Sequence, residues 1–578
     1  MGTRIAVVDR DLCTREECGY RCIKACPVNR MGQECIVKED ESRFPVISEM
    51  LCIGCGLCVK KCPVDAIKII NLAAELEKPI FQYGVNAFRL YELPLPKKEG
   101  AVSLVGKNGI GKTTAIQILS GKIRPNFGRK HATDQELDAE LGTEMKRYFS
   151  EIKENLQISS KPQYVDRVRD VFKGKVRELL AKATDNIDEV AEKFNIKEIL
   201  DRDIQHLSGG ELQKVSIALA WSKDADLYYF DEVSNYLDIE ERLRVGILIK
   251  ELAEKKSVLM AEHDLTILDY ISDYVYIIYG TENAYGVVSH VKNVRSGINE
   301  YLAGYLKDEN VRFREYEIGF SGHSESEVKT PAAFKYSSLK KSFDEFNFES
   351  EKGEIRKGEI IGLVGKNALG KSLFVKMLAG AEKADEGEAL EMSVSYKPQY
   401  IKAEDKTVAE IFASRKLDGS VLEECKRRLN LNSLMDKKLT EISGGELQRV
   451  ALTLALSTEA DTYLFDEPTA FLDIEQRFEF ASLLRKVISE KEKNAFVVDH
   501  DIVFMDAIAN RLIVFDGRSS VQGKASAPYA KRDGMNSFLK KVGITMRRDK
   551  DSKRPRINKP ESVLDREQKQ KGDYYYSF

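Results

Sequence analysis

The sequence lacks a long apolar run, a large excess of charge of either sign, and cysteines spread along its length. No apolar run approaches the roughly 20 residues of a membrane-spanning helix. The first residues, MGTRIAVVDRDLCTREEC, carry charges where a signal peptide would have an apolar core. We therefore expect a cytoplasmic protein without a membrane partner. The 90 Lys and Arg residues nearly balance the 93 Asp and Glu residues, so net charge does not indicate a nucleic-acid-binding protein, although local patches could still bind one.

Nine of the ten cysteines lie between Cys13 and Cys62. Without an export signal, disulfides explain this clustering less well than metal binding does. One run, CIGCGLCVKKCP, fits the C-x2-C-x2-C-x3-C-P pattern of bacterial ferredoxins, in which the fourth cysteine binds the other of two clusters. A related run with wider early spacing precedes it and also ends in Cys-Pro.

This crossing rule predicts two [4Fe–4S] clusters. One would be bound by Cys13, Cys18, Cys22 and Cys62, and the other by Cys26, Cys52, Cys55 and Cys58. Cys35 remains as a structural or free thiol. Zinc is the alternative, but the Cys-Pro endings and the crossed pattern favour iron–sulfur clusters. Such ligation would explain how about 70 residues fold with little apolar core.

The remainder of the chain contains an internal duplication. Residues 101–112 read AVSLVGKNGIGK and residues 360–371 read IIGLVGKNALGK, and each is followed by KPQY, SGGELQ and FDE in that order. Ser208 and Asp231 are 23 residues apart, as are Ser443 and Asp466. Lys112 precedes Ser208 by 96 residues, whereas Lys371 precedes Ser443 by 72. The first half therefore carries an insertion of about 24 residues.

We place this insertion near 129–160, a polar and charged segment that is predicted to be helical with exposed faces. It is either a solvated surface decoration or an element on which a partner docks.

Both halves contain the pattern G-x-x-x-x-G-K-[ST] between a predicted strand and a predicted helix. Its backbone N–H groups and the helix N-terminus would face phosphates, its lysine would neutralise their charge, and its hydroxyl would bind Mg²⁺. The candidate ATP-binding residues in these loops are Gly106, Asn108, Gly109, Gly111, Lys112, Thr113 and Thr114 in the first half and Gly365, Asn367, Gly370, Lys371 and Ser372 in the second.

Each half also has an apolar strand that ends in two acids, LYYFDE and TYLFDE. Asp231 and Asp466 are suited to holding Mg²⁺ together with Thr113 and Ser372. Glu232 and Glu467 are placed to polarise or position the attacking water.

The order of SGGELQ before FDE, with His263 and His500 downstream, resembles the ABC ATPases. In that family the SGG signature of one cassette closes over nucleotide bound to the P-loop of the other. The resemblance therefore implies that Lys112 faces Ser443, Gly444 and Gly445, and that Lys371 faces Ser208, Gly209 and Gly210. It also assigns Q-loop and Mg²⁺ roles to Gln163 and Gln399, D-loop roles to Asp238 and Asp473, and catalytic switch roles to His263 and His500.

Three further features concern how similar the two sites are. Tyr83 and Tyr336 precede the P-loops and would either stack on adenine or belong to the core. Ala368 stands where the first P-loop has Gly109. Val233 stands where the second half has Pro468. We expect two sites that differ in rate or affinity.

The predicted fold class is α/β, with two P-loop ABC-type nucleotide-binding domains and a small N-terminal ferredoxin-like α+β iron–sulfur domain. The predicted boundaries are 1–72 for the iron–sulfur domain, 73–283 and 315–530 for the nucleotide-binding domains, and 284–314 and 531–578 for two hinges. The last hinge is rich in Lys and Arg and would either lie on the protein surface or contact nucleic acid.

A two-cluster domain before twin cassettes resembles the E subfamily of ABC proteins, the RNase L inhibitor family of archaeal and eukaryotic ribosome-recycling ATPases. The segments GYRCIKACPVNRMGQECI, GVVSHVKNVRSGINEYLAGYLKDENVRFR and RPRINKPESVLDREQKQKGDYYY also look like segments of this family. The resemblance implies a monomer that pairs its own cassettes and splits ribosomes after termination or rescue, while closure moves the iron–sulfur arm. It further implies contacts of 129–160 and both hinges with the small subunit and its rRNA, and a release factor or Pelota as partner.

The residues alone support only an ATP-gated clamp with a metal-bound arm. A transporter engine would need membrane partners, and a chromosome or repair ATPase would need long heptad coiled coils, which the sequence lacks. A redox enzyme would need a flavin or nicotinamide motif, which is also absent. The alternatives that remain are a clamp in another translation or RNA-related process, and a redox-linked ATPase.

Overall fold

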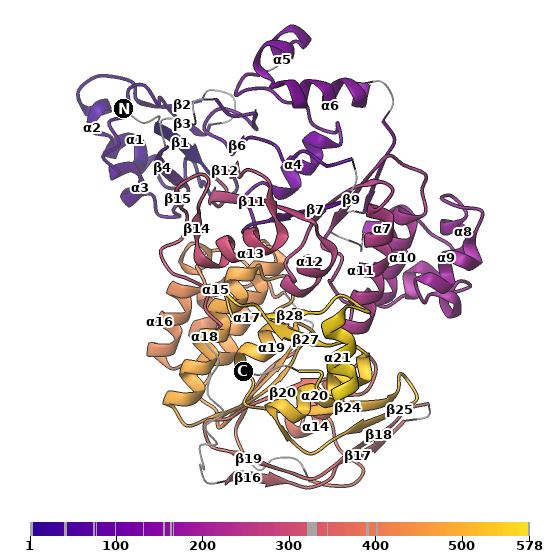
Figure 1. The fold of residues 1–578 in the computed structure, drawn as a ribbon. Helices are drawn as coiled ribbons and strands as arrows, with labels where there is room; N and C mark the ends of the chain where they lie inside the picture. Colours follow the sequence, from indigo (N-terminus) through magenta and orange to yellow (C-terminus); the bar gives the residue numbers. More distant parts are fainter. Residues whose placement is uncertain are drawn as a thin grey trace.

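The computed structural model describes residues 4–575 apart from 40–42, 73–75, 77, 99, 131, 154–155, 162–164, 166, 321–331, 344, 389–391, 400 and 402. In this part of the chain, a small domain precedes two cassettes, each built on a nine-stranded sheet (Figure 1). None of the helices described is long and apolar enough to span a bilayer.

The N-terminal domain consists of two antiparallel strand pairs and three short helices. The pairs are β1 (Arg4–Val8) with β4 (Ile67–Asn71) and β2 (Ile36–Lys38) with β3 (Pro45–Ile47). The helices are α1 (Arg21–Ala25), α2 (Pro27–Arg30) and α3 (Leu57–Lys61). Helix α2 begins directly after Cys26, and α3 ends directly before Cys62. Cysteines and a few aliphatic side chains share the small core of this domain.

The first cassette has a sheet whose central strands are parallel and buried. Continuous apolar strands of this kind are typical of sheets covered by helices on both faces. The strand order is β5 (Phe81–Gln82), β6 (Arg89–Tyr91), β12 (Tyr285–Val288), β11 (Tyr274–Thr281), β7 (Ala101–Val105), β10 (Ser257–Ala261), β9 (Leu227–Asp231) and β8 (Ile158–Lys161), with β13 (Lys292–Asn293) on β11.

The second cassette repeats this order strand for strand. Its sheet runs β17 (Lys340–Ser342), β18 (Asn347–Ser350), β25 (Gln522–Ala525), β24 (Arg511–Arg518), β20 (Ile360–Val364), β23 (Asn494–Val498), β22 (Thr462–Asp466) and β21 (Val394–Lys397), with β26 (Tyr529–Ala530) on β24. A separate pair joins β16 (Ala332–Tyr336) to β19 (Gly353–Arg356).

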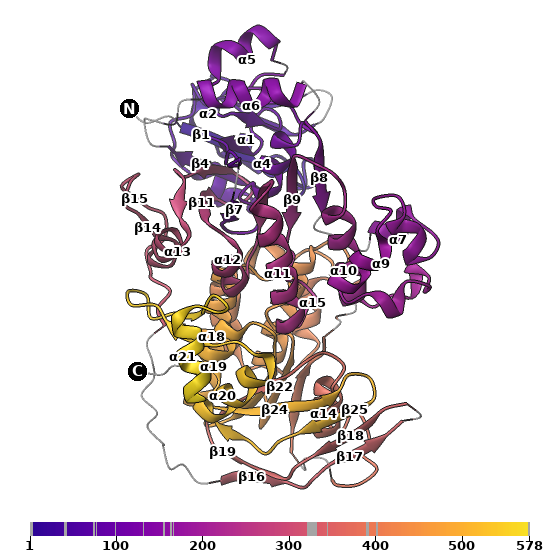
Figure 2. The same cartoon turned by 45° about the vertical axis from the view of Figure 1, so that its right-hand side comes forward.

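Equivalent helices follow equivalent strands in the two cassettes, so the sequence repeat is a structural duplication. The pairs are α4 (Lys112–Leu119) and α14 (Lys371–Leu378) after the P-loops, α10 (Gly209–Trp221) and α17 (Gly444–Ser457) after the SGG serines, α11 (Ile239–Ala253) and α18 (Ile474–Glu490), and α12 (Leu265–Ile271) and α19 (Ile502–Ile508). Smaller helices form the side of each cassette. In the first cassette these are α7 (Arg167–Val171), α8 (Val176–Leu180) and α9 (Ile187–Lys193), which project from the molecule (Figures 1 and 2). In the second they are α15 (Val408–Ala413) and α16 (Gly419–Arg428).

The segment 129–160 contains two helices and one strand. Helices α5 (Asp134–Glu140) and α6 (Thr143–Lys153) lie at the outer end of the first cassette, far from the second (Figures 1 and 2). The end of the segment forms β8, which pairs with β9 as β21 pairs with β22. The added residues therefore lie before β8, because β8 has a counterpart in the second cassette.

Two linking segments contact both cassettes. The expected hinge 284–314 begins with β12, which belongs to the first sheet, and continues with α13 (Val294–Ala303), β14 (Tyr305–Leu306) and β15 (Val311–Arg312). The C-terminal segment contains α20 (Lys531–Val542), β27 (Met546–Arg548), β28 (Pro555–Ile557) and α21 (Val563–Lys571). Helix α20 contacts β24 of the second cassette, whereas β28 contacts α12 of the first.

Candidate functional site

Both P-loops turn sharply between a buried strand and a helix. Gly111 and Gly370 precede α4 and α14 with φ values of 103° and 86°. A Cβ atom on either would lie 2.7 Å from an aromatic carbon of Phe88 or Phe348. Only glycine fits this left-handed and crowded position. The loops can therefore direct the first N–H groups of each helix toward an anion.

The P-loop lysines fold back onto their own loops. Lys112 Nζ donates hydrogen bonds to the carbonyl oxygens of Gly106 at 2.8 Å and Lys107 at 2.6 Å. Lys371 Nζ donates in the same way to Gly365 and Lys366. Burial lowers the pKa of Lys112 and lowers that of Lys371 to about 8. A bound phosphate would supply the negative charge that these buried ammonium groups lack.

The acids at the ends of β9 and β22 have the chemistry of a Mg²⁺ site. Thr113 Oγ1 donates to Asp231 Oδ2 at 3.5 Å. Burial and the neighbouring Glu232 raise the pKa of Asp231, and burial also raises that of Asp466. Both carboxylate oxygens of Asp466 are buried without a hydrogen-bond partner among the described residues. A hard cation that prefers oxygen ligands fits such carboxylates.

Glu232 and Glu467 follow these aspartates in the left-handed backbone region, with φ values of 50° and 48°. Strained backbone of this kind occurs often at active sites. His263 Nε2 lies 4.0 Å from Glu232 Oε1, and His500 Nε2 lies 3.9 Å from Glu467 Oε1. Burial and the charge of the P-loop lysine lower the pKa of both histidines well below its ordinary value, so both imidazoles are neutral at neutral pH.

The D-loop aspartates connect the cassettes. Asp473 Oδ2 accepts a hydrogen bond from the backbone N–H of Asn108 at 3.1 Å, and Asp238 Oδ2 accepts one from Asn367 N at 2.8 Å. The other carboxylate oxygen of each aspartate caps its own helix, α18 or α11. Each D-loop thus fixes the N-terminus of one helix and the P-loop of the opposite cassette at the same time.

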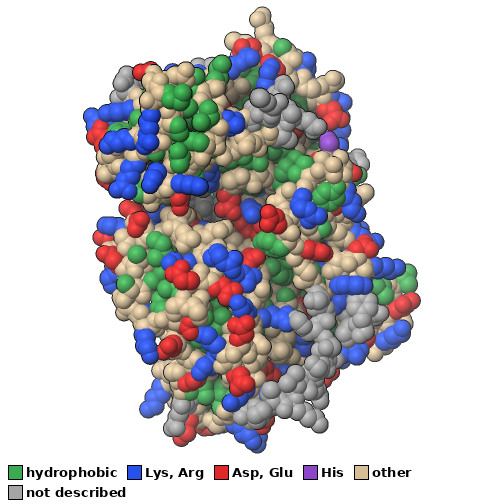
Figure 3. Space-filling view, turned by 90° about the vertical axis from the view of Figure 1, so that its left-hand side faces the viewer, with side chains coloured by type: hydrophobic (Ala, Val, Ile, Leu, Met, Phe, Trp, Pro, Cys, Tyr) green, Lys and Arg blue, Asp and Glu red, His purple; other side chains and the backbone are tan. Residues whose placement is uncertain are grey.

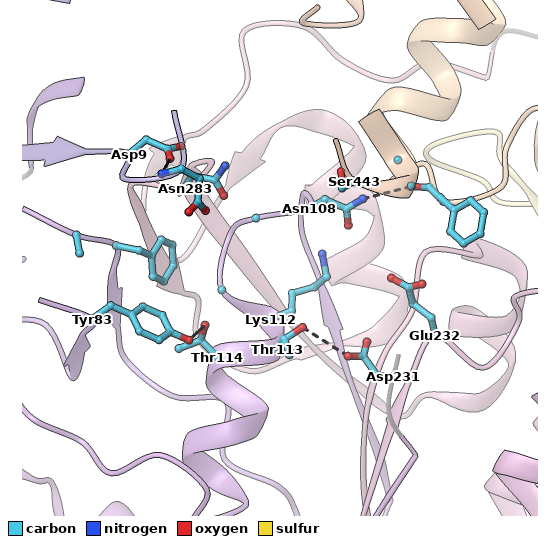
Figure 4. Close-up of a pocket in the computed structure, with 18 of the residues that line it drawn as sticks. Asp9, Tyr83, Asn108, Lys112, Thr113, Thr114, Asp231, Glu232, Asn283 and Ser443 are labelled. Carbon is cyan, nitrogen blue, oxygen red and sulfur yellow. Dashed lines mark hydrogen bonds between the residues drawn. The ribbon is translucent and has the colours of Figure 1, made fainter. Parts of the chain in front are cut away.

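A cavity of about 580 Å³ lies between the first P-loop and the second signature. Asn108, Lys112, Asp231 and Glu232 line it from the first cassette, and Ser443 lines it from the second, with Gly444 and Gly445 (Figure 4). The structure thus brings the predicted partners of Lys112 together. Ser443 accepts a hydrogen bond from Glu446 N and so caps α17.

Tyr83 and the N-terminal domain complete the cavity. Tyr83 lines it, and its hydroxyl lies 3.2 Å from Thr114 Oγ1. Val7–Asp11 of the N-terminal domain and Asn283 also line it, and Figure 4 shows Asp9 and Asn283 on the side opposite Ser443. Tyr336, in contrast, is buried in the core of the second cassette against Phe374. No motif in the sequence pointed to Val7–Asp11, because only the fold brings them to this cavity.

The second site repeats the contact between P-loop and D-loop in reverse. A Cβ atom on Gly210 would lie 2.9 Å from the carbonyl oxygen of Tyr236, to which Asn367 Nδ2 donates at 3.4 Å. Gly209 and Gly210 therefore lie beside the D-loop that holds the second P-loop, and Ser208 caps α10 as Ser443 caps α17. Ser372 follows Lys371 on α14. Gln399 Nε2 donates to Glu467 Oε1 at 2.7 Å, whereas Gln163 lies outside the described residues.

The N-terminal cysteines form two groups. Cys13 and Cys22 interact electrostatically with Cys18 and Cys62, and Cys58 does so with Cys26, Cys52 and Cys55. Burial and the neighbouring thiols raise the pKa of Cys22 and Cys58 to about 11. Cys35 is buried beside Cys26, Cys52 and Cys58. Over the described ranges, no three His, Cys, Asp or Glu side chains gather closely enough to hold a single metal ion.

Comparisons with known proteins identify the family of this chain. The family model described as ABC transporter matches residues 94–235 and 349–470, that of the 4Fe-4S binding domain matches 45–68, and that of a possible Fer4-like domain in RNase L inhibitor matches 3–34. ABC transporter E family member 1 of Arabidopsis thaliana is 42% identical, over 99% of both chains. The translation initiation factor RLI1 of Saccharomyces cerevisiae is also 42% identical, over 99% of this chain and 98% of its own. This chain belongs to the E subfamily of ABC proteins.

Solved structures agree with this assignment. The protein in a model of ribosome-bound archaeal Pelota and ABCE1 is 48% identical and covers 100% of this chain and 99% of its own, with a TM-score of 0.94. The archaeal ribosome recycling factor aABCE1, crystallised with the ribosomal stalk protein aP1, is 47% identical over 86% of this chain and 99% of its own, with a TM-score of 0.82. The protein is therefore an ABC-type ATPase with two ATP-binding cassettes and an N-terminal iron–sulfur domain.

Proposed function

We propose that this protein is an ATP-driven ribosome recycling factor that splits ribosomes into subunits after termination or rescue. One observation carries the mechanism: the cavity of the first site is lined by both cassettes and by the N-terminal domain. A nucleotide bound there would contact the arm and the clamp together. The near-full-length similarity to a protein solved on the ribosome with Pelota supplies the target.

In this proposal each ATP site is shared between the cassettes. Lys112 and Lys371 bind the phosphates, and the opposite SGG residues supply further donors that arrive only on closure. Glu232 and Glu467 position the attacking water, and the neutral His263 and His500 accept or donate one hydrogen bond beside it. Mg²⁺ would neutralise phosphate charge, held by Asp231 and Asp466 with Thr113, Ser372, Gln163 and Gln399.

We also propose two [4Fe–4S] clusters, one bound by Cys13, Cys18, Cys22 and Cys62, the other by Cys26, Cys52, Cys55 and Cys58. The two groups of neighbouring thiols support this assignment. The Cys-Pro endings and the crossed pattern of the two cysteine runs favour clusters over zinc. Bound clusters would cross-link the domain into a rigid arm, because each takes ligands from both cysteine runs.

The partners are the small ribosomal subunit with its rRNA and a release factor or Pelota, so the protein would act in the cytoplasm. Helices α5 and α6 and both hinges are the proposed ribosome contacts. The N-terminal domain exposes Met50 and Ile53, and the face in Figure 3 shows apolar side chains bordered by Lys and Arg. Such a mixed surface suits a partner with both protein and RNA components.

Sucrose-gradient centrifugation tests the function. Purified ribosomes incubated with ATP, the protein and a release factor should sediment as subunits. The Glu232→Gln, Glu467→Gln double variant should not support repeated rounds of splitting. Intact ribosomes after incubation with a protein of verified ATPase activity would refute recycling.

Cysteine variants test the clusters separately. Replacing Cys22 or Cys55 with serine should lower bound iron from about eight to about four atoms per chain, spare ATP binding and abolish splitting. Cys35→Ser is the matched control and should retain the iron. Splitting that persists after iron loss would show that the clusters are dispensable.

A further inference from the structure

Two buried arginines occupy equivalent places at the cassette interface. Arg242 lies in the first turn of α11 and Arg477 in the first turn of α18, directly after the D-loops. Their side chains are 10% and 7% exposed. Neither belongs to a nucleotide-binding motif that the sequence reveals. Buried arginines are costly unless their donors are satisfied, so their contacts indicate what they do.

Each arginine makes two hydrogen bonds within its own cassette. Arg242 Nε donates to the carbonyl oxygen of Leu237 at 2.8 Å, and its Nη1 donates to Asp264. Arg477 makes the equivalent bonds to Leu472 at 2.9 Å and Asp501 at 2.8 Å. Asp264 and Asp501 cap α12 and α19. The arginine therefore ties the D-loop to the start of the helix that follows the switch histidine.

The same guanidinium group also crosses the interface. Arg477 Nη1 donates to the backbone carbonyl oxygen of His263 at 3.2 Å, and Arg242 Nη1 donates to that of His500 at 3.4 Å. Besides burial and the P-loop lysine, the opposite arginine contributes to the lowered pKa of each histidine. The planar, multi-donor guanidinium suits such a bridge between a carboxylate and a carbonyl group.

The two bridges meet at one centre. Helices α12 and α19, which Asp264 and Asp501 cap, contact each other across the interface. Burial together with the charge of Asp264 raises the pKa of Asp501 to about 6. A small cavity there is lined by Arg242, Arg477, Glu467 and His500. When the cassettes separate, each arginine can keep its own aspartate but must lose the opposite carbonyl group.

We propose that Arg242 and Arg477 are positioning residues that act in trans: Arg477 holds the switch histidine of the first site, and Arg242 holds that of the second. Each site would then become competent for hydrolysis only when the other cassette delivers its arginine. The inference rests on the proposed roles of the glutamates and histidines. It predicts that each arginine serves the ATP site whose P-loop lies in the other cassette.

Single-site parents of the full-length protein test this crossing. Glu467→Gln leaves the first site active and Glu232→Gln leaves the second. Arg477→Gln should lower kcat about 10-fold in the Glu467→Gln parent, since one hydrogen bond from a charged group is lost, and change KM little. In the Glu232→Gln parent it should change kcat less than about twofold. Arg242→Gln should show the reverse pattern.

The controls separate the possible failures. Arg244→Gln, on an exposed side of α11, the helix that carries Arg242, should leave kcat of both parents unchanged. Losses in the site of the arginine's own cassette, or equal losses in both sites, would overturn the proposal and make the arginine a brace for Asp264 or Asp501. Where a glutamine variant melts early or fails to bind a fluorescent ATP analogue, the lysine variant replaces it, with the same crossed loss expected. Parents that retain full turnover would refute the glutamate assignment instead.

Discussion

At the scale of single residues, the two glutamates beside the phosphate sites have different neighbours. Asn235 Nδ2 donates to Glu232 Oε2 at 2.6 Å, whereas Ala470 occupies the equivalent position near Glu467. A hydrogen bond from an amide weakens a carboxylate as a base and fixes its orientation. We expect Asn235→Ala to speed hydrolysis at the first site by about 3- to 10-fold, the range for part of one charge-assisted hydrogen bond. Turnover in the Glu467→Gln parent measures this.

The reciprocal exchange is the control. Ala470→Asn should slow the second site in the Glu232→Gln parent by a similar factor, because it adds a second amide donor beside Glu467, which already accepts from Gln399. If both exchanges changed turnover in the same direction, the difference between the sites would have another origin, such as Ala368 or Pro468.

Residue types could be predicted where the chemistry is local. The P-loop lysines, the acids after β9 and β22 and the cysteine runs are read from short motifs because a few neighbouring residues complete each one. Asn108 and Asp473, in contrast, meet only through the fold, and the family resemblance assigned Asp473 a D-loop role without naming Asn108 as its partner. Arg242, Arg477 and Val7–Asp11 carry no periodic or local pattern. Their place at the sites depends on how separate domains dock.

At the scale of elements, the loop between β5 and β6 joins the ATP cavity to the N-terminal domain. Tyr83 and Phe88 line the cavity, while Asn86 donates to the carbonyl oxygens of Ala6 at 2.9 Å and Ile47 at 3.1 Å and accepts from Ile47 N at 2.8 Å. We expect Asn86→Ala to weaken docking of the domain by about 2–4 kcal/mol, because these buried groups lose their partner. Hydrogen exchange of β1 and β3 measures the loss.

Val85→Ala in the same loop is the matched control, since Val85 is exposed and makes no such bonds. Unchanged exchange in the asparagine variant would show that other contacts, such as the 2.7 Å ion pair of Arg89 with Glu49, suffice to dock the domain.

Short strands were the elements that sequence patterns could not place. Ile158–Ser160 of β8 and YGVV in β12 were assigned to an insertion and to a hinge, yet both pair with longer strands of the first sheet. Four residues are too few to show a strand period. Their pairing is instead decided by β9, β11 and β6, which come from distant parts of the chain.

At the scale of the whole molecule, the C-terminal segment holds the cassettes together. Lys531 and Arg548 pair with Asp506 of the second cassette at 3.2 and 2.9 Å. Arg554 and Arg556 pair with Asp269 of the first at 3.2 and 2.6 Å. Against the effect of burial, these two arginines lower the pKa of Asp269. The segment is thus a salt-bridged strap across both cassettes.

Asp269→Asn should detach this strap from the first cassette. Arg554 is fully buried, and a buried charge that loses its partner costs about 3–5 kcal/mol. We expect faster hydrogen exchange in β27 and β28 and a cassette unfolding that separates into two calorimetric transitions, because the connection between the cassettes weakens. Asp551→Asn, at an exposed pair with Arg295, should leave a single transition. A single transition with unchanged exchange in Asp269→Asn would mean that the D-loop contacts alone couple the cassettes, and that the C-terminal segment only covers them.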